Sequence, residues 1–360
     1  MGDHMNRLDI AVLPGDGIGV EVTDATLAVL RHVTERHGIG MRFTTLKAGA
    51  FAYQETGEAM SEEVFERAAQ ADAILLGAMG WPGIRMADGT EIAPQLDLRF
   101  RLGLYAGVRP IRAIPGLATV LANPRAAEID LVIIRESTEG LFYSRDKGVV
   151  TGGFAEEILR ITRPTTERLA RFSFELARQR KKPGGGVTLV DKANVFRAFA
   201  YMRSIFEEVA IENRDIAFGS HYVDAMALDF VRRPWDFDVL PTENMFGDIL
   251  SDLGAGLIGG MGFAPSADIG DAHAVFQPSH GTAPDIAGKG IANPTAMILS
   301  GAMMLDWLAV TRDGGQACRD AAAEIRAAVD KAFGAGLRTP DIGGPAGTKA
   351  VTDAVIEHLK

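Results

Sequence analysis

Short apolar runs alternate with helical patterns along the chain, and this alternation limits the possible folds more than any other feature. The chain opens with LDIAVLPGDGIGVEVTDATLAVLRHV, in which an apolar strand runs into a glycine-rich turn and a segment of helical period follows. Further apolar runs are ADAILLGAMG, VRPIRAIPG, EIDLVIIRES, GGVTLVDK and FDVLPTEN. Helical patterns cover 61–70, 156–180, 193–212, 246–258 and 294–311, and an alanine-rich helix follows in ACRDAAAEIRAAVDKAFGAGL. Strands that alternate with helices predict an α/β fold with a largely parallel sheet.

The glycine-rich turn PGDGIG does not match the dinucleotide-binding fingerprint. Gly15, Gly17 and Gly19 form G-x-G-x-G, whereas the fingerprint is G-x-G-x-x-G. An ordinary Rossmann site also needs an acid about twenty residues further on, and HGIGMRFTTL contains none. We therefore interpret the motif as a tight strand-to-helix turn and assign no cofactor to it.

The charge balance limits the partners of the protein. Its 360 residues allow two domains, and 47 acidic residues against 37 Lys and Arg give a formal net charge of −10. Nucleic acid and anionic membrane surfaces both attract a basic face, so neither is an expected partner. The single cysteine, Cys318, cannot form an intrachain disulfide, which fits a reducing compartment. Without a membrane-spanning apolar run or a signal-peptide pattern, we expect a soluble cytoplasmic enzyme.

Two acids lie four residues apart in ENMFGDILSDLGAGLIGGMG, a segment without Lys or Arg. Residues at this spacing are neighbours on a helix, so Asp248 and Asp252 would repel each other. In one interpretation Asp248 caps the helix and Asp252 is merely exposed. In the other a divalent cation joins them, because Mg²⁺ and Mn²⁺ prefer carboxylate oxygens. Asp224, in HYVDAMAL, is a candidate third ligand.

Three arginines are candidates for binding carboxylates. Arg99 and Arg109 lie in LDLRFRLGLYAGVRP, and Arg135 ends the apolar strand of VIIRESTEG. A lone arginine is usually on the surface, but the carboxyl end of a strand in an α/β fold borders the ligand crevice. Acids for a metal beside arginines for carboxylates indicate a metal-chelated hydroxy-diacid as the ligand.

These motifs resemble those of the metal-dependent β-decarboxylating dehydrogenases. In order they are LPGDGIGVE, VRP, VIIRESTEG, VDKANVF, YVDAMAL, NMFGDILSDLGAG and HGTAPDIAGKGIANPTAMILS. The resemblance runs from about residue 8 to residue 358 and is closest to the isopropylmalate branch, with isocitrate, homoisocitrate, tartrate and D-malate dehydrogenases as other branches. It implies two domains on a mostly parallel sheet, unlike an ordinary Rossmann fold. Residues 6–104 and 260–360 would form the cofactor-side domain, and 105–259 an inserted domain with the dimer interface and metal ligands.

The resemblance also implies roles for the candidate residues. Substrate carboxylates would be bound by Arg99, Arg109 and Arg135. The ligands of Mg²⁺ or Mn²⁺ would be Asp248, Asp252 and, from the partner subunit of a homodimer, Asp224. The partner would also supply Lys192 as the proton acceptor and Asn194 as a neighbouring polar contact.

The same resemblance places the cofactor on HGTAPDIAGKGIANP. His280, followed by Gly281, would lie against the adenine, and Asn293 would bond it. Asp285 falls where NAD-using members carry an acid for the adenosine ribose hydroxyls. Because a carboxylate repels a 2′-phosphate, this residue predicts NAD rather than NADP.

One position departs from the family pattern at the catalytic acid. The family has a tyrosine seven residues after the third arginine, where this chain has Phe142, followed by Tyr143. In a strand, a one-residue slip turns the side chain to the opposite face. Either a bulge returns Tyr143 to the site as the acid, or another group such as water protonates the enolate.

The second departure concerns the substrate. A helix is expected over DGTEIAPQLDLR, which ends at Arg99. Isopropylmalate enzymes have an apolar pair in this helix, where this chain has Gln95 and Leu96, with Ile92 a turn earlier. A desolvated Gln amide against an isopropyl group would cost about 1–3 kcal/mol, and a polar or smaller C3 group removes that objection. The segment GAMGWPG, which contains Trp81, resembles the tartrate and D-malate branch.

We therefore predict NAD- and metal-dependent oxidative decarboxylation of a 3-substituted malate. The favoured reaction converts 3-isopropylmalate to 2-oxo-4-methylpentanoate in leucine biosynthesis. Tartrate or D-malate is the alternative substrate. The alternative of another class is a catalytically impaired homologue that binds NADH or a diacid.

Overall fold

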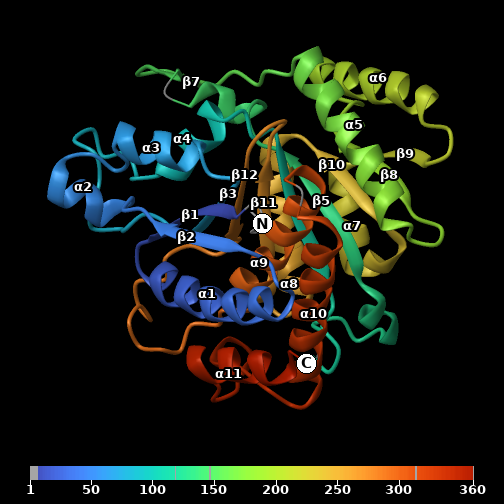
Figure 1. Ribbon diagram of the computed structural model, residues 1–360. Coiled ribbons are helices and arrows are strands. Elements are labelled where there is room, and N and C mark those ends of the chain that lie inside the picture. Colours follow the sequence, from blue (N-terminus) through green and yellow to red (C-terminus); the bar gives the residue numbers. More distant parts are fainter. Residues whose placement is uncertain (1–6, 118, 146, 313, 360) are drawn as a thin grey trace, which may run out of the picture.

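The computed structural model describes residues 7–117, 119–145, 147–312 and 314–359, and its centre is one ten-stranded sheet (Figure 1). The strand order is β2-β1-β3-β12-β11-β4-β5-β10-β8-β9. Their bounds are β1 (Leu8–Gly15), β2 (Met41–Thr45), β3 (Ala73–Ala78), β4 (Ala106–Arg112), β5 (Asp130–Glu136), β8 (Gly186–Asp191), β9 (Ala217–Tyr222), β10 (Val239–Thr242), β11 (Pro265–Ile269) and β12 (Ala274–Pro278). Among the described residues, six neighbouring pairs are parallel, while the three central pairs from β12 to β5 are antiparallel. The prediction of an α/β fold with a mostly parallel sheet is confirmed.

The two halves of the sheet come from different parts of the chain. One half is built from strands within 8–78 and 265–278, and the other from strands within 106–242. The halves meet where β11 pairs with β4, so that segments far apart in sequence lie side by side at the centre of the sheet.

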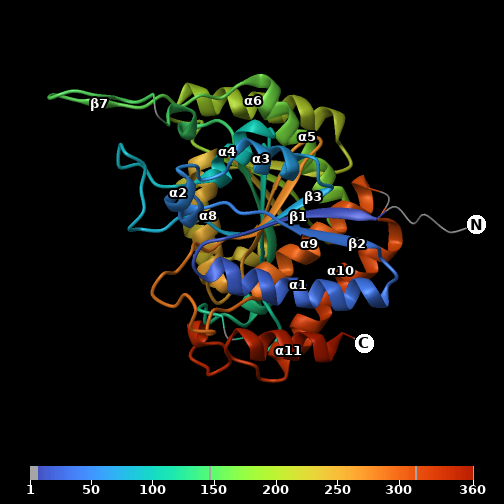
Figure 2. The same cartoon turned by 60° about the vertical axis from the view of Figure 1, so that its left-hand side comes forward.

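Helices cover both faces of the sheet. They are α1 (Ile18–Arg36), α2 (Ala50–Thr56), α3 (Glu62–Ala69), α4 (Pro94–Arg101), α5 (Arg163–Arg180), α6 (Arg197–Glu212), α7 (Val223–Arg232), α8 (Asn244–Leu257), α9 (Thr295–Thr311), α10 (Gly315–Gly334) and α11 (Thr348–His358). α1 and α9 pack on β3, and α10 and α11 pack outside them, whereas α5 packs on β8 and β10 and α8 on β4 and β5 (Figure 2). With helices on both faces, strands such as AILLGA of β3 are buried at every position.

Shorter elements connect these layers. They are the 3₁₀-helices η1 (Pro124–Glu128), η2 (Leu141–Ser144), η3 (Pro234–Asp236), η4 (Met261–Phe263) and η5 (Pro340–Ile342), and the strands β6 (Val149–Val150) and β7 (Ala155–Glu156). β6 and β7 pair as a hairpin that projects from the body of the molecule (Figure 2). No helix among the described residues is both long enough and apolar enough to cross a membrane.

Two expected helix boundaries are wrong. The helix expected over 156–180 begins only at Arg163, with Pro164 in its first turn, and the Thr162 N–H just before it donates to Glu139 (2.8 Å). The helix before Arg99 begins at Pro94, so DGTEIA is not helical. Both helices have a proline in the first turn, where its missing N–H costs no intrahelical bond.

The glycine-rich turn is required by packing. Gly17 has φ 57°, and a Cβ there would lie 2.2 Å from the carbonyl oxygen of Thr282. The Ile18 N–H donates to the same oxygen (2.9 Å). The buried Asp16 carboxylate accepts three N–H bonds from the starts of neighbouring segments, from Ala50, Phe51 and Gly80. The turn thus holds the segment 280–293 against the start of α1.

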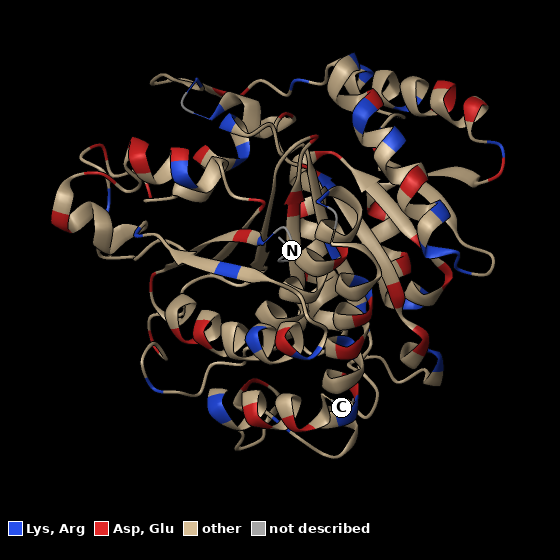
Figure 3. Cartoon of the chain, in the orientation of Figure 1, with Lys and Arg blue, Asp and Glu red and all other residues tan. Residues whose placement is uncertain are grey.

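Charges of both signs are interspersed over the outer helices (Figure 3). On α5 and α6, Arg163 pairs with Glu208 and Arg171 with Glu212, each at 2.7 Å. These pairs are exposed to solvent, so each contributes little to the free energy of unfolding. The negative net charge is therefore not gathered on these helices.

Candidate active site

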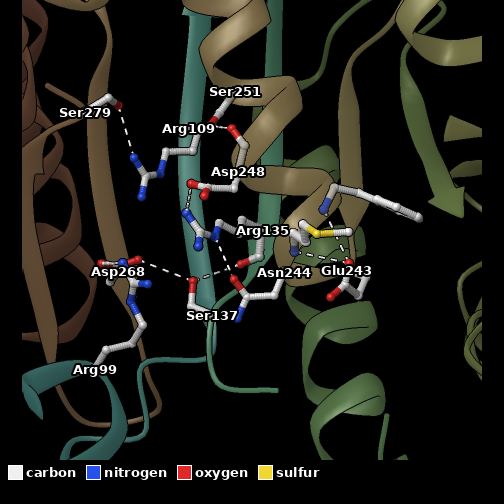
Figure 4. Close-up of polar contacts among 12 residues, drawn as sticks. Arg99, Arg109, Arg135, Ser137, Glu243, Asn244, Asp248, Ser251, Asp268 and Ser279 are labelled. Carbon is white, nitrogen blue, oxygen red and sulfur yellow. Dashed lines mark hydrogen bonds and ion pairs between the residues drawn. The ribbon is translucent and has the colours of Figure 1, made fainter. Parts of the chain in front are cut away.

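Strand register brings two arginines and an aspartate to one face of the sheet. Gly107 of β4 lies opposite Asp268 of β11 on one side and opposite Arg135 of β5 on the other. Arg109 is two residues after Gly107, and alternate residues of a strand face the same way. Arg99 reaches this cluster from α4 (Figure 4).

Arg135 is held by α8. Its Nε donates to Asn244 Oδ1 (2.8 Å), and its Nη1 forms an ion pair with Asp248. Asn244 and Asp248 are four apart and so lie on one face of the helix. Burial and the charge of Arg99 lower the pKa of Arg135 to about 10, which still leaves its guanidinium charged at neutral pH.

Arg99 and Arg109 keep buried donors without acceptors. Arg99 Nη2 donates to Asp268 Oδ2 (2.9 Å), and Arg109 Nη1 donates to Ser279 Oγ (3.2 Å). Within the described part of the chain, neither Nε has a hydrogen-bond partner, although both residues are at most 7% exposed. Burial lowers the pKa of Arg109, against the opposing charge of Asp268. An unpaired buried donor costs about 1–3 kcal/mol, so this site suits carboxylates that can accept from these groups.

The two acids of α8 lie beside the arginines and do not cap the helix. Glu243 is the cap, because its carboxylate accepts the N–H groups of Met245 (3.1 Å) and Phe246 (3.3 Å). The interpretation of Asp248 as the cap is therefore wrong. Partial burial and the like charge of Asp248 raise the pKa of Asp252. A divalent cation would remove this repulsion.

Asp224 is not joined to the acids of α8. It lies in the first turn of α7, its side chain is 68% exposed, and it pairs with Lys192 Nζ at 2.5 Å. This pairing lowers the pKa of Asp224. Asn194, two residues after Lys192, is exposed. The described residues contain no group of three His, Cys, Asp or Glu side chains suited to a metal, so one chain alone provides two acids of the expected site.

Phe142, and not Tyr143, faces the arginine cluster. The ring centre of Phe142 lies 5.0 Å from Arg135 Cζ, whereas the Tyr143 ring lies 3.9 Å from Lys147 Nζ and 4.6 Å from Arg160 Cζ. The strand expected here is wrong, because both residues belong to η2. At 3.0 residues per turn, successive 3₁₀ side chains diverge by about 120°. Both rings line a cavity of about 760 Å³, so the catalytic role of Tyr143 stays a prediction.

The residues just before Arg99 differ in how far they are buried. Gln95 and Leu96 lie half-buried in the first turn of α4, and Ile92 before it is fully buried. Gln95 Oε1 is buried, and no donor among the described residues reaches it. Trp81 packs on Phe51, with ring centres 5.2 Å apart.

In the predicted cofactor segment, one ring nitrogen of His280 is available to bind a ligand. His280 Nδ1 lies 2.9 Å from the Gly281 carbonyl, and its Nε2 is buried with no partner among the described groups. Burial lowers the pKa of His280, so its imidazole is neutral at neutral pH. Asp285 is exposed on the same loop. A neutral imidazole and an exposed carboxylate suit the roles predicted for them.

Asn293 already has partners in the fold. Its Oδ1 accepts the N–H (3.1 Å) and the hydroxyl (2.6 Å) of Thr295 at the start of α9. Its Nδ2 donates to Asp341 (3.1 Å). One amide hydrogen remains for a ligand, so its predicted contact with adenine would come from Nδ2.

Sequence reasoning missed several residues that shape this site. The spacing of Asn244 before Asp248 was a usable signal. Glutamate is not among the residues preferred at an N-cap, so no local signal in the sequence indicated the role of Glu243. The contacts of Asp268 depend on strand pairing, and no local pattern could have shown them.

Comparison with known proteins gives consistent matches over nearly the whole chain. The family model described as isocitrate/isopropylmalate dehydrogenase matches residues 9–358. The 3-isopropylmalate/3-methylmalate dehydrogenase of Methanocaldococcus jannaschii is 42% identical over 98% of this chain and 98% of that protein. The 3-isopropylmalate dehydrogenase of Moorella thermoacetica is 43% identical over 97% of each. The crystal structure of isocitrate dehydrogenase from Methylococcus capsulatus has a TM-score of 0.85 and 37% identity, covering 98% of this chain and 99% of that one.

Proposed function

Because the chain belongs to the isocitrate/isopropylmalate dehydrogenase family, we propose that it oxidises and decarboxylates a 3-substituted malate with NAD⁺ and a divalent cation. The class, an oxidative decarboxylating dehydrogenase, follows from the family. We propose 3-isopropylmalate as the substrate, 2-oxo-4-methylpentanoate as the product and leucine biosynthesis as the setting. The proposal is carried by the convergence of three buried arginines and two helical acids on one face of the sheet.

The residues fit both expected cofactors. Mg²⁺ or Mn²⁺ would be held by Asp248, by Asp252, whose pKa is raised beside Asp248, and by Asp224 of the partner subunit. NAD⁺ would lie on the loop that carries the partnerless His280 Nε2 and the exposed Asp285. When bound, the cation supplies a Lewis acid for the C2 oxygen, and NAD⁺ accepts the hydride from C2.

The residues of the chain bind the substrate and move protons. Arg99, Arg109 and Arg135 would hold the two carboxylates, since two of them have buried donors to satisfy. Lys192 pairs with Asp224 in the single chain and loses this partner when Asp224 serves as a ligand. In its unprotonated form, the Lys192 amine would then accept the proton of the C2 hydroxyl. After the C3 carboxylate leaves as CO₂, the enolate takes a proton at C3 from Tyr143 or water.

A homodimer would complete the site. Large apolar side chains are exposed on α7, α8 and the β6–β7 hairpin, at Leu228, Val231, Ile249, Val150 and Phe154. α7 and α8 pack against each other, so their exposed residues offer one surface to a second copy. We propose that this copy supplies Asp224, Lys192 and Asn194, that residues 105–259 form the domain carrying this interface, and that the enzyme is cytoplasmic.

A second substrate is favoured by one observation. Gln95 Oε1 is buried without a donor, and a C3 hydroxyl, as in tartrate, could donate to it, whereas an isopropyl group cannot. The deciding experiment follows NADH formation with Mn²⁺ for 3-isopropylmalate, D-malate and tartrate in parallel. The highest kcat/KM for 3-isopropylmalate supports the first proposal. If D-malate or tartrate has the highest kcat/KM, Gln95 faces the substrate and the isopropylmalate assignment fails.

A further inference from the structure

We propose that Asp268 restricts the substrate to two carboxylates, by fixing Arg99 and by cancelling one of the three arginine charges. This inference rests on the proposed function and specifies the substrate class of the same site. It separates dicarboxylic 2-hydroxy acids from tricarboxylic ones.

The Asp268 carboxylate is held by donors from three segments. It is 2% exposed, and its Oδ2 accepts from Arg99 Nη2 (2.9 Å) and from Gln277 Nε2 (2.8 Å). Its Oδ1 accepts from Ser137 Oγ at 3.4 Å. Gln277 is two residues beyond Val275, the strand partner of Asp268, so both side chains lie on one face. Asp268 therefore has one orientation, and it sets the orientation of Arg99 (Figure 4).

Gly107 leaves the space that this carboxylate occupies. A Cβ at Gly107 would lie 2.7 Å from Ser137 Oγ and 3.2 Å from Asp268 Oδ1. Because Gly107 stands between Asp268 and Arg135 in the sheet, a larger residue there would push the two charged side chains apart. The absence of a side chain at Gly107 of β4 thus leaves room for the Asp268 carboxylate.

The charges of the cluster favour a dianion. Burial would raise the pKa of Asp268, but the charges of Arg99 and Arg109 outweigh it and lower that pKa, so Asp268 is an anion at neutral pH. With Asp248 and Asp252 assigned to the cation, three buried guanidinium groups and one buried carboxylate leave two positive charges for the substrate. A third substrate carboxylate would find no further guanidinium charge within this cluster, which is unfavourable for a carboxylate buried there.

The proposal can be tested by binding, with no turnover required. Isothermal titration of the full-length protein, with Mg²⁺ in excess, would compare butanedioate with propane-1,2,3-tricarboxylate. Wild type should bind the dicarboxylate more tightly, and equal or reversed affinities would overturn the proposal. In Asp268→Asn the ratio of tricarboxylate to dicarboxylate affinity should rise about tenfold, equivalent to about 1.4 kcal/mol. An unchanged ratio in a folded variant also overturns it.

A matched control separates charge from packing. Gln277→Met removes one hydrogen bond to Asp268 but keeps the charge of the cluster, so it should weaken both ligands and leave their ratio within about twofold of wild type. A tenfold change here would mean that packing controls selectivity, and would overturn the proposal. Asp268→Ser provides a second neutral variant if Asp268→Asn does not fold, and the wild-type comparison needs no variant.

Kinetics distinguish this inference from the proposed function. With 3-isopropylmalate, Asp268→Asn should raise KM more than it lowers kcat, because Arg99 binds and does not react. Activity with isocitrate should rise relative to 3-isopropylmalate. If wild type turns over none of the 3-substituted malates, yet prefers the dicarboxylate in titration and loses that preference in Asp268→Asn, the proposed function fails and the role of Asp268 stands.

Discussion

Replacing Glu136 by glutamine tests how burial controls protonation beside Arg135. Glu136 ends β5 and is 5% exposed, and its carboxylate accepts the N–H (2.6 Å) and hydroxyl (2.6 Å) of Thr138 and the N–H of Glu139 (2.7 Å). These bonds favour the charged form, but burial outweighs them and raises the pKa of Glu136 from 4.5 to about 7. The folded protein therefore binds a proton at mildly acidic pH that the unfolded chain releases.

This shift gives the sign and size of a stability change. Between pH 4.5 and pH 7 the folded state holds more protons than the unfolded state, so the free energy of unfolding falls as pH rises through this window. Each pKa unit corresponds to 1.36 kcal/mol, and the shift therefore amounts to about 3 kcal/mol at neutral pH. Glutamine cannot titrate, so Glu136→Gln should lose this contribution and gain stability relative to wild type as pH rises.

Urea unfolding of both proteins between pH 4.5 and pH 7 would measure this difference. The free energy of unfolding of the variant minus that of wild type should increase by about 3 kcal/mol across the window, whatever its value at the acidic end. Glu66→Gln, on the exposed face of α3, is the matched control and should follow the wild-type pH dependence. A difference for Glu136→Gln that stays constant with pH would refute burial as the cause.

Four further predictions concern the site. Asp285→Lys should shift preference toward NADP, and an unchanged ratio of kcat/KM for the two cofactors would sink that assignment. Tyr143→Phe should lower decarboxylating turnover about 10²-fold or more if Tyr143 is the acid; full turnover would remove this role. Asp252→Asn should raise the Mn²⁺ concentration for half-maximal activity roughly tenfold, and an unchanged Mn²⁺ titration would exclude Asp252 as a ligand. Gln95→Leu should raise kcat/KM for 3-isopropylmalate relative to tartrate by at least about fivefold, because it removes a buried carbonyl without a donor; equal ratios would place Gln95 outside the substrate contact.

The alternation of strands and helices was predictable because apolar periodicity is a local property. β3 is an uninterrupted apolar run since both faces of the sheet are covered, and the helix expected over 294–311 appears as α9 with a shift of one residue. The predicted bounds of helices and strands were wrong where a local feature favoured another conformation. Pro164 delays the start of α5, and a 3₁₀ turn replaces the expected strand at Phe142.

Contacts between residues of one sequence motif were predicted. Contacts that depend on the pairing of distant strands were not. Asp248 and Asp252 are neighbours by helical spacing alone, so their proximity was visible in the sequence. The ion pair between Arg99 and Asp268 spans 169 residues and depends on β11 lying antiparallel beside β4. The sequence around Asp268, PSADIG, contains no pattern that indicates Arg99 as its partner.

The strand register at the centre of the sheet also determines where the charge proposed to select the substrate lies. Asp268, Gly107 and Arg135 are direct neighbours on three adjacent strands, at the place where the two halves of the sheet meet. Because side chains alternate along a strand, a slip of β11 by one residue would turn Asp268 to the opposite face and leave Arg99 buried without its counter-ion. Any sequence change that shifts this pairing should therefore alter both carboxylate selectivity and stability.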